Sequence, residues 1–561
     1  MTAQTSVFRA AVVQTLAELG DIPANITLVR NYVEEAVRQG ADLVVLPECM
    51  NSGYLFDSVE HARAIAEPLD GEYPQAIQSL CREYGVYIAT GFTEQGKQGR
   101  IYNSGLFYDA EGTLRLHYQK QFLATHDQNW FDCGVKGNPV VDTALGRVGL
   151  LICFDGRIPE IARSLALDGA DVILDMANFF AMDQADLWVP ARAMENGVWI
   201  VAATKAGVER SIYYPGGSMI VSPDGEVMAY VEQDTHGVVS WDVDVAQARK
   251  KRWIAGGDRI SDRRPETYRL IAKPVDQTPL GEVLDTPLVP EESTGKVAAV
   301  QAHALPDGTG LEEAWQMVEH AARLGVKLVV TPPFLAHSHW LPDATEAVGL
   351  ANRTPKLIER AEQIGRRWQT HILFTSVEGE GGALYHTAFL VGPAGELIGK
   401  YRQVHLEPEM QDWCIAGDGW PVFETAVGRV GIILGYDGRF PESTRELALG
   451  GADIVAYPAL WREKRERDLL VLPKAEDNRI YLVAANRTDT PFIGGSLVVP
   501  PNGFPLWQMD LVAPVNRRHG AVMPAFAHLA LSRQKFMIPK VNMLRNRLTE
   551  TYGVIIRNEL G

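Results

Sequence analysis

The chain has few cysteines, and they are not arranged to bind a metal or to form a disulfide framework. Its 561 residues include five cysteines, and none of them belongs to a CxxC pair. A small, odd number of scattered cysteines is typical of reduced thiols in a cytoplasmic protein. We therefore predict a cytoplasmic location, no metal site and no cofactor.

The chain also lacks long apolar runs and an excess of basic residues. No stretch approaches the roughly 18 consecutive apolar residues that a membrane-spanning helix requires. The first residues, MTAQTSVFRAAVVQ, do not resemble a secretory signal. The formal net charge is −17, from 53 basic and 70 acidic residues, which opposes nonspecific binding to nucleic acid. We expect neither a membrane nor a nucleic acid as a partner.

What the sequence does contain is an internal repeat. Residues 149–160 read GLLICFDGRIPE, and residues 431–442 read GIILGYDGRFPE. Other pairs follow in the same order, such as RAAVVQ with KVAAVQ, GADVIL with GADIVA, and GGSMIVSPDG with GGSLVVPPNG. Similarity that keeps its order along the whole length indicates a tandem duplication.

The composition changes between the two copies, over residues 272–294. Four prolines interrupt this stretch: Pro274, Pro279, Pro287 and Pro290. Repeated prolines favour extended chain over helix and sheet, so we interpret the stretch as a linker. The predicted domains are then residues 1–271 and 295–561, each long enough for its own core.

Within each copy, short runs rich in valine and isoleucine alternate with amphipathic segments. FRAAVVQ, DLVVLPE and WIVAAT have the composition of buried strands, and residues 25–39 and 158–168 have helical spacing of apolar residues. Turn signals such as AEGTL and SPDGEV separate adjacent strands and predict hairpins. The pattern favours a layered α/β fold with mixed sheets.

Three chemically useful side chains follow predicted strands in the first copy. Glu48 ends LVVLPE, Lys120 lies in HYQKQFL, and Cys153 ends LLIC at a strand-to-helix connection. Strand ends are where α/β folds collect functional groups, and a nearby helix N-terminus lowers the pKa of a thiol. A thiol nucleophile, a carboxylate base and a fixed positive charge suit acyl transfer from a C–N bond.

These short motifs and their order along the chain resemble those of the nitrilase, or carbon–nitrogen hydrolase, superfamily. The similarity rests on LPE, YQK and ICFDGRIPE, and it extends through residues 7–270. It implies two α-β-β-α sandwich domains. It also implies that Glu48, Lys120 and Cys153 form a catalytic triad.

Several further residues are candidates for the site. By resemblance, Asp127 stands where the family often has a second acid that orients the lysine, and it is shorter than the usual glutamate. An Asx turn on a surface loop is the alternative for this residue. Arg157 could hold a substrate carboxylate or shape the turn after Cys153, and the presence of Arg439 in the second copy favours the structural role. Asn178 and Phe179 follow a predicted strand and are candidates to line the pocket.

The second copy has lost all three triad residues. Glu48 aligns with Pro333, Lys120 with Gln403, and Cys153 with Gly435. We predict that this half is inert as a hydrolase. By resemblance to the paired subunits of the superfamily, it forms an internal pseudo-dimer with the first half. Whether whole chains associate further into homo-oligomers stays open.

The leading hypothesis is a thiol amidase that releases ammonia from a small amide through a thioester on Cys153. A nitrilase or an N-carbamoyl amidohydrolase with the same triad are alternatives. The alternative from another class is a ligand-binding or scaffolding pseudoenzyme, and the intact triad argues against it for the whole chain.

Overall fold

The structure is a computed structural model that describes residues 7–181, 183–286, 294–304, 308–337, 341–503, 507–508 and 520–558. The chain divides into two compact units. Unit 1 contains residues up to 254 together with 538–541 and 546 onwards, and unit 2 contains 255–537 and 542–545. None of the helices in the described part is long and apolar enough to span a membrane.

Unit 1 contains two mixed sheets of six strands. The first has the order β14 (Gly237–Asp244), β1 (Val7–Gln14), β2 (Leu43–Val45), β3 (Tyr87–Gln95), β4 (Ile101–Tyr108) and β5 (Leu114–Gln119). The second has the order β13 (Val227–Tyr230), β12 (Met219–Val221), β9 (Trp199–Thr204), β8 (Val172–Ala177), β7 (Gly146–Leu151) and β6 (Val140–Thr143). The predicted hairpins are confirmed, since β4 pairs antiparallel with β5, and β12 with β13.

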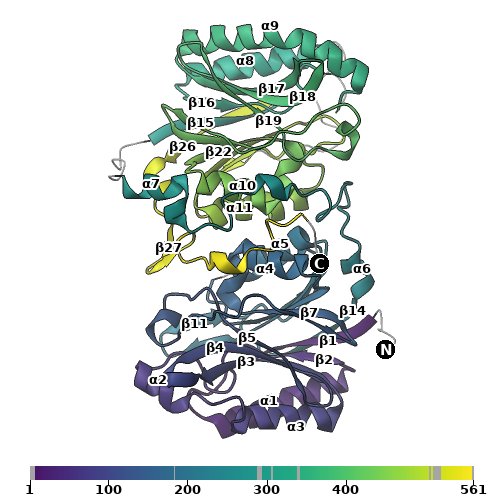
Figure 1. Ribbon diagram of the computed structural model, residues 1–561, viewed down its shortest axis with the longest axis vertical. Helices are drawn as coiled ribbons and strands as arrows, with labels where there is room; N and C mark the ends of the chain where they lie inside the picture. The colour runs from purple at the N-terminus through teal and green to yellow at the C-terminus, as the bar shows by residue number, and fades with distance from the viewer. Residues whose placement is uncertain are drawn as a thin grey trace. The chain divides into compact units, whose positions relative to one another are not determined.

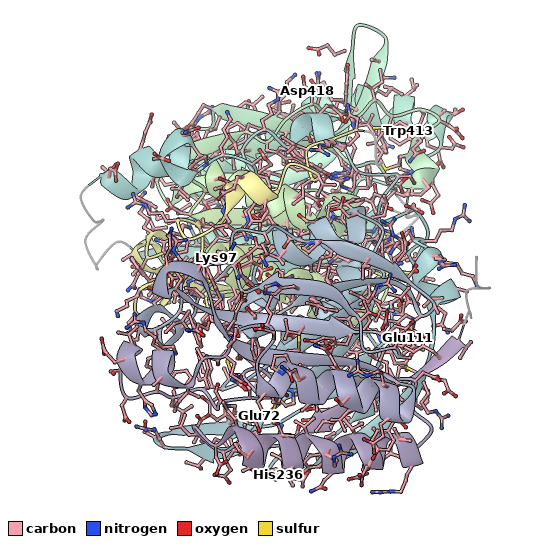
Figure 2. All side chains as sticks on the ribbon, turned by 60° about the horizontal axis from the view of Figure 1, so that its bottom comes forward. Glu72, Lys97, Glu111, His236, Trp413 and Asp418 are labelled. Carbon is pink, nitrogen blue, oxygen red and sulfur yellow. The ribbon has the colours of Figure 1, made fainter. Side chains whose placement is uncertain are left out.

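Helices cover the outer face of each sheet of unit 1. Helices α1 (Ile22–Arg38) and α3 (Glu72–Tyr84) lie on the first sheet, and α4 (Pro159–Leu167) and α5 (Val189–Asn196) lie on the second (Figure 1). Glu72, at the first turn of α3, is labelled in Figure 2. Alternate residues of each strand face the helices, as in Ala11 and Val13 of β1, so the amphipathic helices complete a core. The predicted α-β-β-α sandwich is confirmed.

Unit 2 repeats this topology strand for strand. Its first sheet has the order β19 (Leu397–Arg402), β18 (Ala383–Val391), β17 (His371–Glu380), β16 (Leu328–Val330), β15 (Thr294–Gln301) and β26 (Ala521–His528). Its second has the order β20 (Val422–Thr425), β21 (Gly428–Ile432), β22 (Ile454–Ala459), β23 (Tyr481–Asn486), β24 (Leu497–Val499) and β25 (Trp507–Gln508). The outer helices are α8 (Thr309–Arg323), α9 (Ala344–Trp368), α10 (Pro441–Leu449) and α11 (Leu472–Asn478).

The stretch interpreted as an extended linker contains a helix. Helix α7 spans Pro279–Asp285, and Pro279 occupies its first turn, where a proline has no hydrogen bond to lose. The interpretation as extended chain is therefore wrong for this part, because proline breaks a helix only in its interior. Pro287 and Pro290 lie outside the described residues.

Each unit also contains a segment that lies just after the other sequence copy along the chain. Residues from 255 onwards, which follow the first copy, belong to unit 2, and residues from 546 onwards, near the end of the second copy, belong to unit 1. In unit 2, Arg263 pairs with Glu442 of α10 at 3.1 Å. In unit 1, Arg547 pairs with Glu160 of α4 at 2.9 Å. The two ion pairs are equivalent in position, so the duplicated fold places the same kind of segment on the same helix of each unit.

Candidate active site in unit 1

Glu48 lies just past β2, on backbone that is closely packed. Its N–H donates to the carbonyl of Ala177 at 3.3 Å, and the next residue, Cys49, has a left-handed backbone with φ of 54°. Gly91 of β3 faces this turn, and a Cβ built there would be 2.3 Å from the Cα of Glu48. The glycine therefore leaves the room that the Glu48 turn needs.

Lys120 follows β5 and lies between two carboxylates. Its backbone N–H donates to the carbonyl of Asn103 at 2.8 Å. Its Nζ is 2.7 Å from Oε1 of Glu48 and 2.8 Å from Oδ2 of Asp127, and all three side chains are buried. Asn103 donates from Nδ2 to both carboxylates as well. The structure thus places Glu48, Lys120 and Asp127 together, as the sequence predicted.

Asp127 is held from several sides rather than lying on a surface loop. It begins the short helix η2 (Asp127–Asn129) and is fully buried. Tyr54 donates its hydroxyl to Oδ1 at 2.9 Å, and the N–H of Ala124 donates to Oδ2 at 2.8 Å. The shorter acid still reaches Lys120 because the loop brings its backbone close. The surface-loop alternative for Asp127 is therefore wrong.

Cys153 follows β7 in a strained turn. It opens the short helix η3 (Cys153–Arg157) with φ of 51°, a conformation that side chains other than glycine rarely adopt. Its N–H donates to Oδ1 of Asp175 at 2.8 Å. Gln184 donates from Nε2 to the Cys153 sulfur at 3.7 Å. The turn is therefore anchored through its backbone while the thiol lines a pocket.

Burial and mutual charge set the protonation of these groups. Burial raises the pKa of Glu48, and the charge of Lys120 offsets only part of that shift. Burial lowers the pKa of Lys120, but the charges of Asp127 and Glu48 outweigh it, so that the pKa lies well above its ordinary value. Lys120 is thus a permanent cation, and Glu48 is a stronger base than a carboxylate in water.

The expectation that a helix N-terminus lowers the pKa of Cys153 is wrong. Burial raises the pKa of this thiol well above its ordinary value, and the charge of Glu48 raises it further. The charge of Lys120 acts in the opposite direction but is smaller in effect. The resting group is a thiol, so it needs a base before it can attack.

Asp155, which both copies share, holds the turn after Cys153. Its carboxylate accepts the Tyr118 hydroxyl at 2.7 Å and the backbone N–H groups of Phe122 and Ile152 at 2.8 and 3.2 Å. Burial raises its pKa to about 6. The second copy retains this residue as Asp437.

Phe179 lines this pocket together with Trp188, whereas Arg157 lies behind it against the Trp188 ring. Arg157 pairs with Asp183 at 3.0 Å and lies 3.1 Å from the centroid of the Trp188 ring. Arg439 in unit 2 likewise pairs with a carboxylate, that of Glu466. This arrangement favours the structural role for Arg157.

Neutral polar groups around Cys153 lack partners among the described residues. Oε1 of Gln184 and Nε1 of Trp188, which line the pocket, are buried without a hydrogen bond there. Both polar atoms of the Asn178 side chain are also buried and unpaired, although Asn178 is not among the lining residues. Buried polar groups are normally paired, so unpaired ones at a pocket suggest a ligand or water. No group of three or more His, Cys, Asp or Glu in the described part is arranged to hold a metal.

A second buried cation lies near the site and is also paired. Lys205 contacts Oε2 of Glu209 at 2.5 Å and lies 4.6 Å from the centroid of the Tyr214 ring. Glu209 in turn accepts the N–H groups of Tyr54 and Leu55 at 2.7 and 2.9 Å. This ion pair therefore fixes the backbone of Tyr54, whose hydroxyl contacts Asp127.

The equivalent place in unit 2 keeps the backbone and loses the groups. The N–H of Gln403 donates to the carbonyl of His386 at 3.0 Å, as that of Lys120 does to Asn103. Gly435 opens η8 (Gly435–Arg439) with φ of 40°, as Cys153 opens η3. Pro333 stands at the position of Glu48, and the residue after it, Phe334, has φ of 50°. The predicted alignment of these three positions therefore agrees with the structure.

Comparisons with known proteins match both copies. The family model described as carbon–nitrogen hydrolase matches residues 9–252 and 296–512. A nitrilase from Pyrococcus abyssi is 36% identical over 262 residues, covering 46% of this chain and 98% of the relative. An (R)-stereoselective amidase from a Pseudomonas species is 31% identical over 258 residues, covering 45% of this chain and 90% of the relative. A solved amidase from Nesterenkonia sp. has 25% identity and a TM-score of 0.39, covering 44% of this chain and 93% of that one.

Proposed function

The chain belongs to the carbon–nitrogen hydrolase family and hydrolyses carbon–nitrogen bonds, and on this premise we propose that unit 1 is an amidase that releases ammonia from a small amide. The observation that carries the proposal is the buried Lys120, which lies between Glu48 and Asp127 and whose charge acts on the thiol of Cys153 in its strained turn. The internal pseudo-dimer, in which unit 2 supports unit 1, stays part of the proposal.

The proposed reaction begins with proton transfer from Cys153 to Glu48. As the thiol loses its proton, the sulfur attacks the amide carbon, and the positive charge of Lys120 stabilises the developing oxyanion. Glu48 returns the proton to the nitrogen as the C–N bond breaks, and ammonia leaves. Water, deprotonated by Glu48, then attacks the thioester and releases the carboxylic acid and the thiol.

Asp127 is proposed as a positioning residue. It contacts Lys120 at 2.8 Å and accepts from Tyr54, so it fixes the direction of the ammonium group. Asp127 also balances the charge of Lys120. When Glu48 holds a proton it is neutral, and Asp127 is then the carboxylate that remains paired with Lys120. Lys120 therefore stays charged throughout the proposed cycle.

The charges near the pocket support a neutral acyl group. Arg157 is paired with Asp183, and Lys205 with Glu209. The unpaired polar atoms that line the pocket are neutral ones, namely Oε1 of Gln184 and Nε1 of Trp188. A substrate carboxylate would be desolvated without a new cationic partner, which is costly. We therefore place uncharged amides ahead of monoamides of dicarboxylic acids and N-carbamoyl amino acids, with uncharged nitriles as the near alternative.

A screen for ammonia release tests this proposal. Purified full-length protein is assayed with uncharged aliphatic and aromatic amides, the matching nitriles, monoamides of dicarboxylic acids and N-carbamoyl amino acids. We expect kcat/KM for uncharged amides to exceed that for the acidic substrates by about tenfold or more, because the acidic group finds no free cation.

Two cysteine variants provide the control. Cys153→Ala should abolish ammonia release, whereas Cys81→Ala, which removes a buried thiol on α3, should not. Faster turnover of acidic substrates would refute the assignment of the acyl group but leave the thiol mechanism standing. Undiminished turnover by Cys153→Ala would refute the mechanism itself.

A further inference from the structure

Unit 2 retains a pocket at the place where unit 1 has its active site, although its lining has different chemistry. The two pockets are lined by residues at equivalent positions, with Gly435 for Cys153, Tyr457 for Asp175 and Glu466 for Gln184. The cavity of the unit 2 pocket measures about 20 Å³, compared with about 10 Å³ in unit 1, so each has room for a ligand of about the size of a water molecule. The duplication has therefore kept the space while it removed the nucleophile.

The most informative lining residue is Glu407. Its carboxylate fills the position of the missing thiol, because a Cβ built on Gly435 would be 2.2 Å from Oε1 of Glu407. Oε1 accepts the N–H of Tyr436 at 2.9 Å, and Oε2 accepts from Nε2 of Gln403 at 2.9 Å. Unit 2 has Gly435 and Gln403 where unit 1 has Cys153 and Lys120. Gly435 leaves room for the Glu407 carboxylate, and Gln403 donates a hydrogen bond to it.

Glu407 forms no ion pair with any described residue, although it is buried. The two arginines of the pocket have carboxylate partners of their own, Arg439 with Glu466 and Arg462 with Glu409. The lysine that faces the carboxylates in unit 1 is replaced by the neutral Gln403. Burial raises the pKa of Glu407 to about 7, and its charge also interacts with that of Arg439, whose ion-pair partner is Glu466.

Aromatic and aliphatic side chains form the rest of the wall around this carboxylate. Tyr457 donates its hydroxyl to the carbonyl of Gly435 at 2.8 Å, and its ring packs edge-on against that of Trp461, with centroids 5.8 Å apart. Leu460 and Leu470 complete the lining. Aromatic faces attract cations, and a carboxylate accepts hydrogen bonds from N–H groups.

From this geometry we infer that the unit 2 pocket binds a small primary ammonium ion, such as ammonium or a short alkylammonium, with its N–H groups on Glu407 and its charge beside Tyr457 and Trp461. A hard metal ion is a poorer occupant, because it prefers several oxygen ligands. The site makes unit 2 an amine-binding module rather than an inert copy. The inference does not depend on the activity of unit 1.

Equilibrium dialysis of the full-length protein with ¹⁴C-methylammonium tests the inference. We expect saturable binding of methylammonium. Ammonium should displace the bound methylammonium, whereas potassium and tetramethylammonium should not, because neither of these two ions has an N–H group to donate. Absence of saturable binding, or equal displacement by potassium, would overturn the inference.

Three variants locate the binding in unit 2. Glu407→Gln should weaken it by about 30-fold or more, because the ligand loses the one carboxylate of the described pocket lining that forms no ion pair. Leu470→Trp places the Trp188 side chain of unit 1 at the equivalent position and should block the pocket while keeping Glu407. Glu424→Gln, which removes an exposed carboxylate on β20, is the matched control and should bind normally. Normal binding by both Glu407→Gln and Leu470→Trp would also overturn the inference.

Discussion

The two units share every strand pairing of the sandwich, yet their central sites have opposite electrostatics. In unit 1 a buried lysine lies between two carboxylates, beside a thiol. In unit 2 the buried Glu407 carboxylate lies beside a glycine and forms no ion pair with a described residue, because the Arg439 guanidinium of the same pocket pairs with Glu466. The fold therefore does not require the catalytic groups, since its cores and sheet orders persist without them.

The residues common to both units separate structure from chemistry. Asp155 and Asp437 both accept from a tyrosine hydroxyl at 2.7 Å, and both hold the turn at the end of the strand before them. These aspartates serve the turn, whichever residue stands at its start. The proposed chemistry depends on the positions that differ, and exchanging those positions tests the comparison.

The largest effect is expected from Cys153→Gly, which copies Gly435 into unit 1. Ammonia release should fall by about 10⁴-fold or more, because no other group replaces the nucleophile. The reverse change, Gly435→Cys, should add no activity to that variant, since the new side chain collides with Glu407. A coupled ammonia assay measures both. Recovery of turnover in the double variant would show that unit 2 has kept a working site.

The next largest effect is expected from Lys120→Gln, which copies Gln403. The rate should fall about 10²- to 10³-fold through the lost oxyanion charge. Unfolding should also become easier by about 3 kcal/mol, because Glu48 and Asp127 are left as buried carboxylates without a cation. Steady-state kinetics and urea unfolding measure the two losses. Lys97→Gln changes an exposed lysine and is the control; an equal loss there would contradict the explanation.

The sequence pointed to the candidate site residues that stand in short sequence motifs. Glu48, Lys120 and Cys153 stand in short motifs, and Asp127 was assigned through the resemblance of those motifs to the family. The alternation of strands and helices likewise predicted the layers. Helix α7 was missed because a proline count does not distinguish the first turn of a helix from its interior.

Residues whose role depends on tertiary contacts could not be predicted in the same way. Asn103 reaches Glu48 and Asp127 only because β4 lies between β3 and β5 in the sheet. Asp175 reaches the backbone of Cys153 from the neighbouring strand β8. Glu407 was overlooked because its counterpart in unit 1, Ala124, has no chemistry to compare.

A smaller effect is expected from Gly91→Ala, which tests a difference in packing between the units. Thr375 occupies the equivalent position of β17 in unit 2, where its hydroxyl accepts the N–H of Phe334 in the equivalent turn at 3.1 Å. In unit 1 the added methyl would displace the backbone of Glu48, and a shift of about 1 Å costs up to about 100-fold in rate. Gly237→Ala on β14 has open space and is the control. Equal kcat values for the two variants would refute the packing argument.

The smallest effect concerns the stability of unit 2 as a function of pH. The pKa of Glu407 is raised by burial to about 7 from an ordinary value of 4.5, so folding favours the protonated form. Its contribution is fully present below pH 4.5 and is lost as the pH rises through 7. Glu407→Gln should therefore gain about 2 kcal/mol over the wild-type chain between pH 5 and pH 8. Urea unfolding at both pH values measures this, with Glu424→Gln as the control. A difference that stays constant between the two pH values would mean that Glu407 titrates normally, and the contrast between the two sites would lose its electrostatic basis.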